Sequence, residues 1–105
     1  MTHKIIHERR GENEVKKFAE AMIEKLNEPK NLAKGGWEDC DIQYLLERTR
    51  EELFELREEI GRWQWCKRNG MNLDSINFRA KQILKEAADV ANFAMMIADK
   101  VGALK

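Results

Sequence analysis

The chain has one proline, six glycines and two cysteines in 105 residues. With so few helix-breaking residues, long stretches of backbone can remain helical. The cysteines, Cys40 and Cys66, stand alone rather than in a CxxC pair. The sequence therefore predicts reduced, intracellular thiols rather than a disulfide framework or a zinc site.

Long apolar runs and an excess of one charge are also missing. No segment reaches the roughly 20 apolar residues that a membrane-spanning helix needs, and the N-terminus lacks the apolar stretch of a secretory signal. Lysine plus arginine equal aspartate plus glutamate at 19 each, and the two signs are interleaved. We therefore expect a soluble, cytoplasmic protein with no membrane partner and no nucleic-acid partner.

The abundant residues favour helix. Glu, Lys, Leu, Ala and Met lose little rotamer freedom on a helical backbone. Apolar residues recur at three- and four-residue steps in three stretches, which begin near residues 12, 42 and 75. The predicted fold class is all-α: a bundle of three to five helices, completed by oligomerisation. Residues 12–105 form its single domain, and residues 1–11 form a polar N-terminal arm.

Local signals predict where these helices begin and end. The expected markers are Pro29 after the first helix, Asp39 or Asp41 before the second, Asn69-Gly70 after it, and Asp74-Ser75 and Gly102 around the third. The proline, paired glycines and tryptophan of residues 27–40 indicate a mobile loop, which is a candidate lid. Gly61 marks a candidate kink. The apolar stripe of the second helix is expected to be Ile42, Leu45, Leu46, Thr49, Leu53, Leu56 and Ile60.

Four carboxylates occupy similar positions on the second and third predicted helices. At about 100° per residue, Glu52 lies roughly 60° and Glu55 roughly 120° to one side of the apolar stripe. Glu86 and Asp89 fall at nearly the same angles on the last helix. If the two helices pack antiparallel, the pairs converge on one edge of their interface. Four anions there need a hard divalent cation, for which Mg²⁺ is the first expectation and Mn²⁺ a substitute.

A surface role is the alternative, because glutamate is common on exposed helix faces. Glu86 and Asp89 lie in EAADVANFAMMIAD, where nearly every other residue is small or apolar, and this favours a site. Other acidic residues of the second helix are interleaved with arginines and are assigned to surface ion pairs. The acids so assigned are Glu51, Glu58 and Glu59, and the arginines are Arg48, Arg50, Arg57 and Arg62.

EELFEL followed by EAADVANF resembles the ExxE and ExxD signature of the MazG-like, all-α nucleoside triphosphate pyrophosphohydrolases. The resemblance runs from the first amphipathic helix through KGGW to the last helix. It implies Mg²⁺-dependent cleavage of a nucleotide between the α- and β-phosphates, giving a monophosphate and pyrophosphate. It also suggests a role in removing non-standard nucleotides. Glu52, Glu55, Glu86 and Asp89 match the metal-binding and catalytic carboxylates.

The resemblance further implies three substrate-binding residues. Lys34 would meet a phosphate, Trp37 would stack on the base or serve as a packing anchor, and Asn92 matches a polar position that follows the ExxD motif. Members of the family are usually dimers or tetramers. Phe93, Met95 and Met96 lie outside the main stripe, so the last helix is expected to contribute to a homo-oligomer with active sites completed across the interface.

The sequence departs from the family pattern between the motifs, where residues 56–85 form a longer stretch than usual. Other readings stay open. A related pyrophosphohydrolase could act on dUTP, dCTP or phosphoribosyl-ATP with the same carboxylates. A catalytically silent helical interaction module would instead use the four acids in salt bridges with lysine and arginine.

Overall fold

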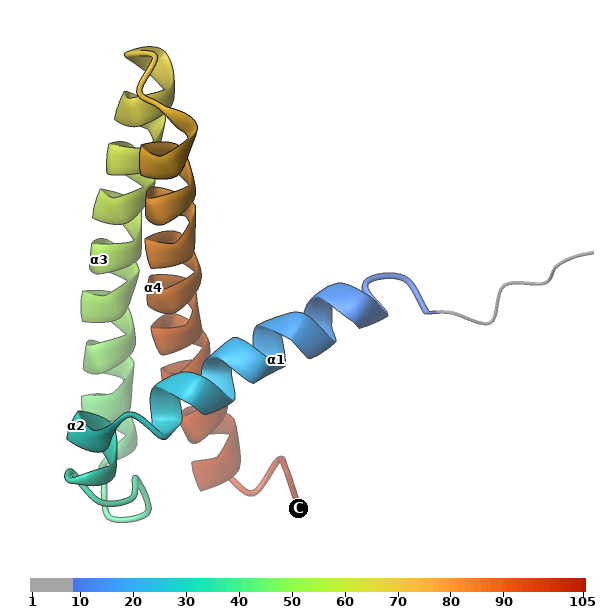
Figure 1. Cartoon of the computed structure of the whole chain (residues 1–105). Coiled ribbons are helices and arrows are strands. Elements are labelled where there is room, and N and C mark those ends of the chain that lie inside the picture. The colour runs from blue at the N-terminus through green and yellow to red at the C-terminus, as the bar shows by residue number, and fades with distance from the viewer. Residues whose placement is uncertain (1–8) are drawn as a thin grey trace, which may run out of the picture.

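A computed structural model describes residues 9–105, which contain four helices. These are α1 (Glu12–Leu26), α2 (Pro29–Leu32), α3 (Ile42–Arg68) and α4 (Leu73–Lys100). α3 and α4 form a long antiparallel hairpin, and α1 crosses α4 and projects away from it (Figure 1). The all-α prediction is confirmed. Residues 1–8 of the predicted polar arm lie outside the described residues.

The predicted ends of α3 are confirmed, whereas α4 begins earlier than expected. Asp41 caps α3 by accepting a hydrogen bond from the Gln43 backbone N–H at 3.2 Å. At the other end of the hairpin turn, Asn72 Oδ1 accepts one from the Ser75 N–H at 2.9 Å. The predicted start at Asp74-Ser75 is therefore wrong. Asn72 and Asp74 are both favourable capping residues, and local preference alone does not choose between them.

The sequence suggested an irregular loop between α1 and α3, but this segment contains the short helix α2. Pro29 ends α1 and also occupies the first position of α2, where its missing N–H is not needed. Asn31 Nδ2 donates a hydrogen bond to the Lys25 carbonyl at 2.6 Å, which joins α2 to the end of α1. Gly61 does not break α3, because the helix continues through it to Arg68.

The face of α3 that packs on α4 differs from the predicted apolar stripe. Leu46, Leu53 and Ile60, which were expected near its centre, remain 37%, 54% and 36% exposed. The buried residues of α3 recur every seventh position instead, and they are Leu45, Glu52, Glu59 and Cys66. Glu59 can occupy this interface because Arg79 of α4 donates a hydrogen bond to it, whereas the ion-pair partner of Glu52 is Arg48 of α3 itself.

The longer stretch between the motifs extends the hairpin as helix. Glu59 lies in this extension and is 6% exposed, although the sequence assigned it to a surface ion pair. Its carboxylate accepts hydrogen bonds from Arg62 at 2.8 Å and from Arg79 of α4 at 3.2 Å. Glu59 therefore joins the two helices in the extended part of the hairpin.

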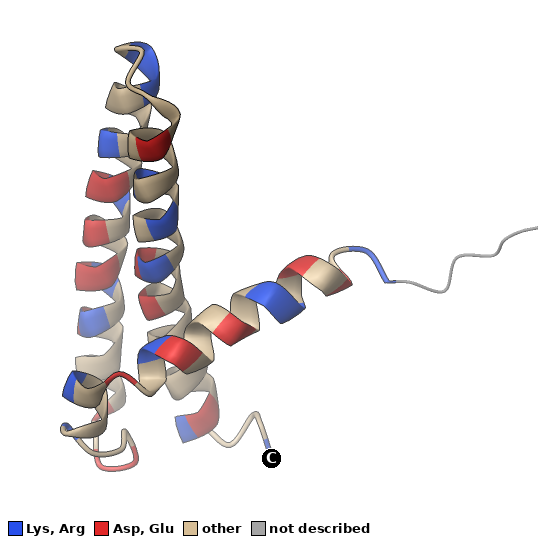
Figure 2. Ribbon diagram, in the orientation of Figure 1, with Lys and Arg blue, Asp and Glu red and all other residues tan. Residues whose placement is uncertain are grey.

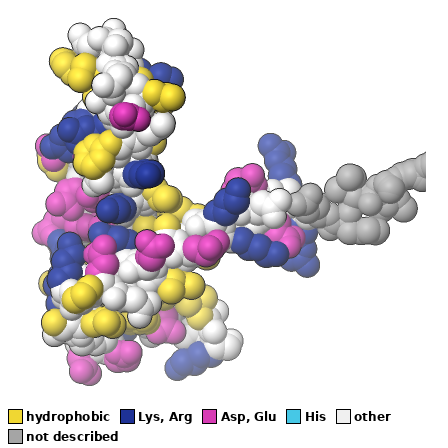
Figure 3. All heavy atoms as spheres, in the orientation of Figure 1, with side chains coloured by type: hydrophobic (Ala, Val, Ile, Leu, Met, Phe, Trp, Pro, Cys, Tyr) yellow, Lys and Arg dark blue, Asp and Glu magenta, His cyan; other side chains and the backbone are white. Residues whose placement is uncertain are grey.

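α1 packs against α4 through its C-terminal part only. Asn92 Nδ2 donates to the Met22 carbonyl at 3.1 Å, whereas Val15 and Ile23 are 67% and 59% exposed. Hydrophobic side chains gather where α1 meets the hairpin and at the hairpin tip (Figure 3).

The chain is extended rather than compact. Its radius of gyration is 17.2 Å, against about 13 Å for a compact chain of this length. None of the described helices is both long and apolar enough to cross a bilayer.

Candidate metal centre

Three of the four predicted carboxylates meet between α3 and α4. One oxygen from each of Glu52, Glu86 and Asp89 lies within 4.8 Å of the others. Glu52 is 7% exposed, and the two residues of α4 are half-buried. The ExxE and ExxD segments are thus adjacent in space, on facing surfaces of the hairpin.

Glu55 lies outside this group of three and is exposed, but it is coupled to the group electrostatically. Burial, a hydrogen bond with the Glu55 carboxyl and the charges of Glu55 and Asp89 raise the pKa of Glu52 to about 7, against the opposing effect of Arg48. Burial and the charges of Asp89 and Glu55 likewise raise the pKa of Glu86. Burial and the neighbouring acids therefore destabilise the charged forms of Glu52 and Glu86.

This donor set fits a hard divalent cation. Opposite oxygen ligands of Mg²⁺ are about 4.2 Å apart, so carboxylate oxygens within 4.8 Å of one another need move only a little to share the ion. The ligands are oxygens alone, which suits Mg²⁺ or Mn²⁺ better than zinc or copper. A bound cation would also offset the repulsion that raises the pKa of Glu52.

Two cations flank the carboxylates, and the sequence interpretation assigned neither to the site. Lys25 Nζ of α1 lies 3.4 Å from Asp89 Oδ2, and Arg48 Nη2 lies 3.4 Å from Glu52 Oε2. Although burial alone would lower it, Asp89 and Glu28 raise the pKa of Lys25. Helical periodicity could not reveal the Lys25 contact, because it depends on how α1 crosses α4.

A pocket of about 720 Å³ adjoins the carboxylates, with Asp89 in its wall. Its lining includes the three residues predicted to bind substrate, Lys34, Trp37 and Asn92. Arg48, which the sequence assigned to the surface, also lines it. The structure therefore places the predicted substrate-binding residues together, beside one of the predicted metal ligands.

The loop that carries Trp37 is fixed to α4 by two hydrogen bonds. Trp37 Nε1 donates to Asp99 Oδ2 at 2.9 Å, and Lys100 Nζ donates to the Glu38 carbonyl at 2.7 Å. Trp37 is consequently a packing anchor and also part of the pocket wall, so the two predicted roles are compatible in this structure.

The amide oxygen of Asn92 is available to accept a hydrogen bond from a ligand. Asn92 is 4% exposed, and its Nδ2 donates to the Met22 carbonyl. Its Oδ1 is buried without a hydrogen-bond partner among residues 9–105. A buried acceptor of this kind favours a ligand or a water that can donate a hydrogen bond to it.

Phe93 and Met96 also line this pocket. The sequence interpretation assigned them to an oligomer surface, and in the single chain they contribute to the pocket wall. Phe93 lies under the Arg48 guanidinium, with 5.0 Å between the Arg48 Cζ and the ring centroid. The ring and the cation therefore form one continuous part of the pocket wall.

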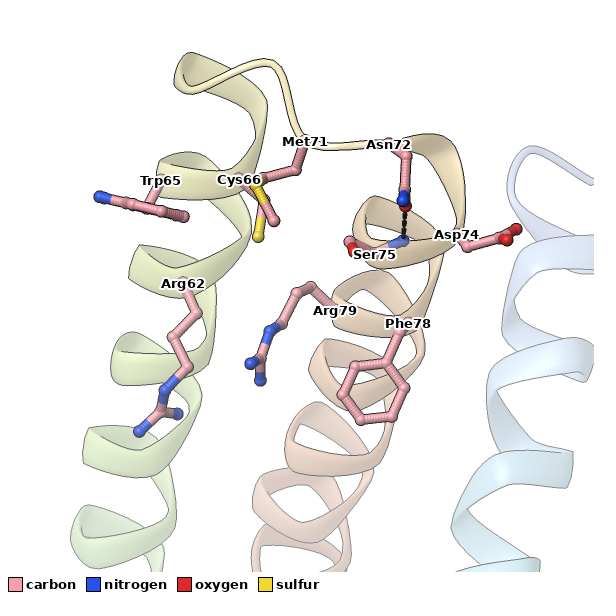
Figure 4. Close-up of a pocket in the computed structure, with 9 residues that line it drawn as sticks. All are labelled: Arg62, Trp65, Cys66, Met71, Asn72, Asp74, Ser75, Phe78 and Arg79. Atoms are coloured by element: carbon pink, nitrogen blue, oxygen red, sulfur yellow. Dashed lines mark hydrogen bonds between the residues drawn. The ribbon is translucent and has the colours of Figure 1, made fainter.

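Another pocket, of about 480 Å³, lies at the tip of the hairpin, far from the carboxylates (Figure 4). Trp65 of α3 and Phe78 of α4 border it, Arg79 extends from α4 toward α3, and Arg62 lies along α3. Asp74 is the acidic residue in its wall, so it has no carboxylate cluster like that around Glu52. We therefore place the candidate site at the other pocket.

Acidic and basic residues are both present along α1, α3 and α4 (Figure 2). No match to known proteins adds to this geometry: no family model matches the chain, and no curated protein or solved structure is significantly similar to it.

Proposed function

We propose that this protein is a Mg²⁺-dependent nucleotide pyrophosphohydrolase of the MazG-like type, which cleaves nucleoside triphosphates between the α- and β-phosphates. The observation that carries the proposal is the group formed by Glu52, Glu86 and Asp89, whose oxygens lie within 4.8 Å of one another. Asp89 also lines the pocket that contains Lys34 and Trp37, so a phosphate held there would be adjacent to the cation.

Glu52, Glu86 and Asp89 would hold the cation, and Glu55 would complete the set of acids. When bound, the divalent ion would neutralise phosphate charge and acidify a bound water. Glu55 is the exposed member and is hydrogen-bonded to Glu52, so it is the better placed of the two to accept a proton from the attacking water. Mn²⁺ would substitute for Mg²⁺ with the same ligands.

The pocket would hold the rest of the nucleotide. The Lys34 ammonium would meet a phosphate, and the Trp37 ring offers a surface for the base while its Nε1 remains bonded to Asp99. Asn92 Oδ1 would accept a hydrogen bond from the substrate. In the cytoplasm, such an enzyme would meet the nucleotide pool, and the reducing environment would keep Cys40 and Cys66 as free thiols.

The proposal includes assembly into a homo-oligomer, a dimer or a tetramer. The support is the extended shape of the chain and the exposure of Val15 and Ile23 on α1. A single copy leaves these two apolar side chains largely exposed, and a second copy would cover them.

Two alternatives have support of their own. The same carboxylates and pocket would serve a related pyrophosphohydrolase acting on dUTP, dCTP or phosphoribosyl-ATP. A silent helical interaction module is favoured by the ion pairs Lys25–Asp89 and Arg48–Glu52, because they already neutralise part of the acidic charge.

The deciding experiment is pyrophosphate release from a panel of ordinary and modified nucleoside triphosphates, dUTP, dCTP and phosphoribosyl-ATP, with and without Mg²⁺. We expect release that requires the metal and is lost in Glu52→Gln and in Asp89→Asn, with helix content by circular dichroism unchanged. Glu58→Gln, a change at an exposed acid of the same helix, is the matched control. Release that persists in both site variants would contradict the assignment, and no release from any substrate would favour the silent module.

A further inference from the structure

Arg48 joins the carboxylates to the pocket. It lies one helical turn before Glu52 on α3, with Nη2 3.4 Å from Glu52 Oε2, and it lines the pocket that contains Lys34. Its side chain is 27% exposed. The arginine therefore touches the candidate metal ligand on one side and the candidate substrate space on the other.

The Arg48 guanidinium is held in place and still has donors available. It lies over the Phe93 ring, 5.0 Å from the centroid, which restricts its orientation. Of the five N–H donors of an arginine, one is directed to Glu51 and one to Glu52. The remaining donors can bind a ligand without loss of either carboxylate.

The charges around the pocket fit an anionic ligand with a flat ring. Lys34 and Arg48 are in the lining, and the one acidic residue there, Asp89, is already paired with Lys25 from α1. Three aromatic side chains also line the space, and they are Trp37, Tyr44 and Phe93. A planar guanidinium matches two oxygens of a phosphate, which a lysine ammonium cannot do.

We propose that Arg48 binds a phosphate group of the ligand in this pocket while it remains in contact with Glu52. This inference rests on the proposed function, since it names the group that would recognise the phosphates at the same site. Arg48 would place the bound phosphate beside the carboxylates that hold the metal. The pocket would then select ligands that carry phosphate, whichever base they carry.

The test is calorimetric binding of inorganic pyrophosphate, and of a non-hydrolysable α,β-methylene nucleoside triphosphate, in the presence of Mg²⁺. We expect Arg48→Met to weaken both at least about tenfold, and Arg48→Lys to weaken them less because it keeps the charge but loses the planar fork. Arg50→Met is the matched control, since Arg50 is 69% exposed on the same helix and pairs with Glu47. It should bind within about twofold of the unaltered protein.

Two further measurements separate binding from folding and from catalysis. Mn²⁺ affinity without phosphate, followed by electron paramagnetic resonance, should change much less in Arg48→Lys than pyrophosphate affinity does. In an active enzyme, Arg48→Lys should raise KM more than it lowers kcat. Unaltered pyrophosphate and nucleotide affinity in folded Arg48→Lys and Arg48→Met, or no binding to the unaltered protein, would overturn the inference. Arg48-dependent binding without turnover of any substrate would uphold it and count against the proposed hydrolysis.

Discussion

Glu52 is a carboxyl group that α3 directs at α4, where burial and the neighbouring acids Glu55 and Asp89 disfavour its charged form. An apolar residue at this position would avoid that cost. Retention of several such acids at one point is typical of a site in which charge is used for binding or catalysis. In the proposed enzyme, Glu52 would therefore serve the metal site at a cost in stability.

The raised pKa of Glu52 predicts how the metal-free protein responds to pH. Below the unfolded-state pKa, near 4.5, the carboxyl is protonated in both states and the folded protein keeps its full stability. As pH rises toward about 7, the unfolded chain has released the proton and the folded chain has not, so stability falls. We expect the melting temperature without divalent ions to decrease from about pH 5 to about pH 7.5, and Mg²⁺ to counter the decrease.

Glu52→Gln provides the control, because glutamine has nearly the same shape and does not titrate. Without metal, its melting temperature should exceed that of the unaltered protein by a margin that grows with pH over the same range. Glu58→Gln should show no such margin. A margin that is absent, or that shrinks as pH rises, would contradict the burial and coupling of Glu52.

The sequence predicted the acids better than their partners. Glu52, Glu86 and Asp89 could be placed together because helical angles and a small, apolar context marked them. Lys25 could not, because its contact with Asp89 depends on the crossing of α1 over α4. Arg48 was assigned to the surface for a related reason, since sequence spacing shows its i,i+4 pair with Glu52 and not the pocket beside it.

Among the helices, the ends of α3 could be predicted from nearby residues, whereas its buried face could not be predicted from apolar periodicity. Asp41 caps the start of α3, and Gly70, with its left-handed backbone, follows the end of α3, both as expected. Such signals are readable because caps and left-handed glycines act within a few residues. The face of α3 was misjudged because periodicity counts only apolar side chains. Glu59 is buried there with Arg79 of α4 as its partner, 20 positions away in the chain, and Glu52 is buried against the acids of α4 with Arg48 of its own helix as its ion-pair partner.

Glu59→Ala tests how the extended hairpin is held together. The change leaves Arg62 and Arg79 facing each other without their shared carboxylate, and we expect it to lower the free energy of unfolding by about 2 kcal/mol. Urea unfolding followed by circular dichroism measures this. Glu58→Ala, at the adjacent exposed position, should change stability by less than about 0.5 kcal/mol.

Because Glu59 is outside the group of three carboxylates, its loss should leave stabilisation by Mg²⁺ in place. A variant with unaltered stability would show that the two arginines find other partners and that Glu59 does not join the helices. Loss of the Mg²⁺ effect in a folded variant would instead extend the metal centre toward the hairpin tip.

At the scale of the molecule, the chain has the shape of a hairpin with one helix projecting from it (Figure 1). Its radius of gyration of 17.2 Å exceeds the value of about 13 Å for a compact domain. The sequence predicted a bundle completed by oligomerisation, and the extended shape supports that proposal. Which surfaces meet could not be read from periodicity, since α1 and α3 both carry exposed apolar residues.

Val15→Glu tests the proposed assembly. Val15 is 67% exposed on the projecting part of α1, so a charge there has no partner to disturb in a single copy. We expect the unaltered protein to be a dimer or a tetramer by light scattering, and Val15→Glu to shift it toward the monomer. Lys16→Met, at the neighbouring exposed position, should not have this effect. A monomeric unaltered protein would contradict the proposal.

Two contacts join α1 to α4: the ion pair of Lys25 with Asp89, and the hydrogen bond from Asn92 to the Met22 carbonyl. Both Asp89 and Asn92 line the candidate site. A second copy that gripped the free half of α1 would thereby fix the position of two groups in the first copy's pocket. In the proposed enzyme, assembly would therefore also hold part of the pocket wall in place.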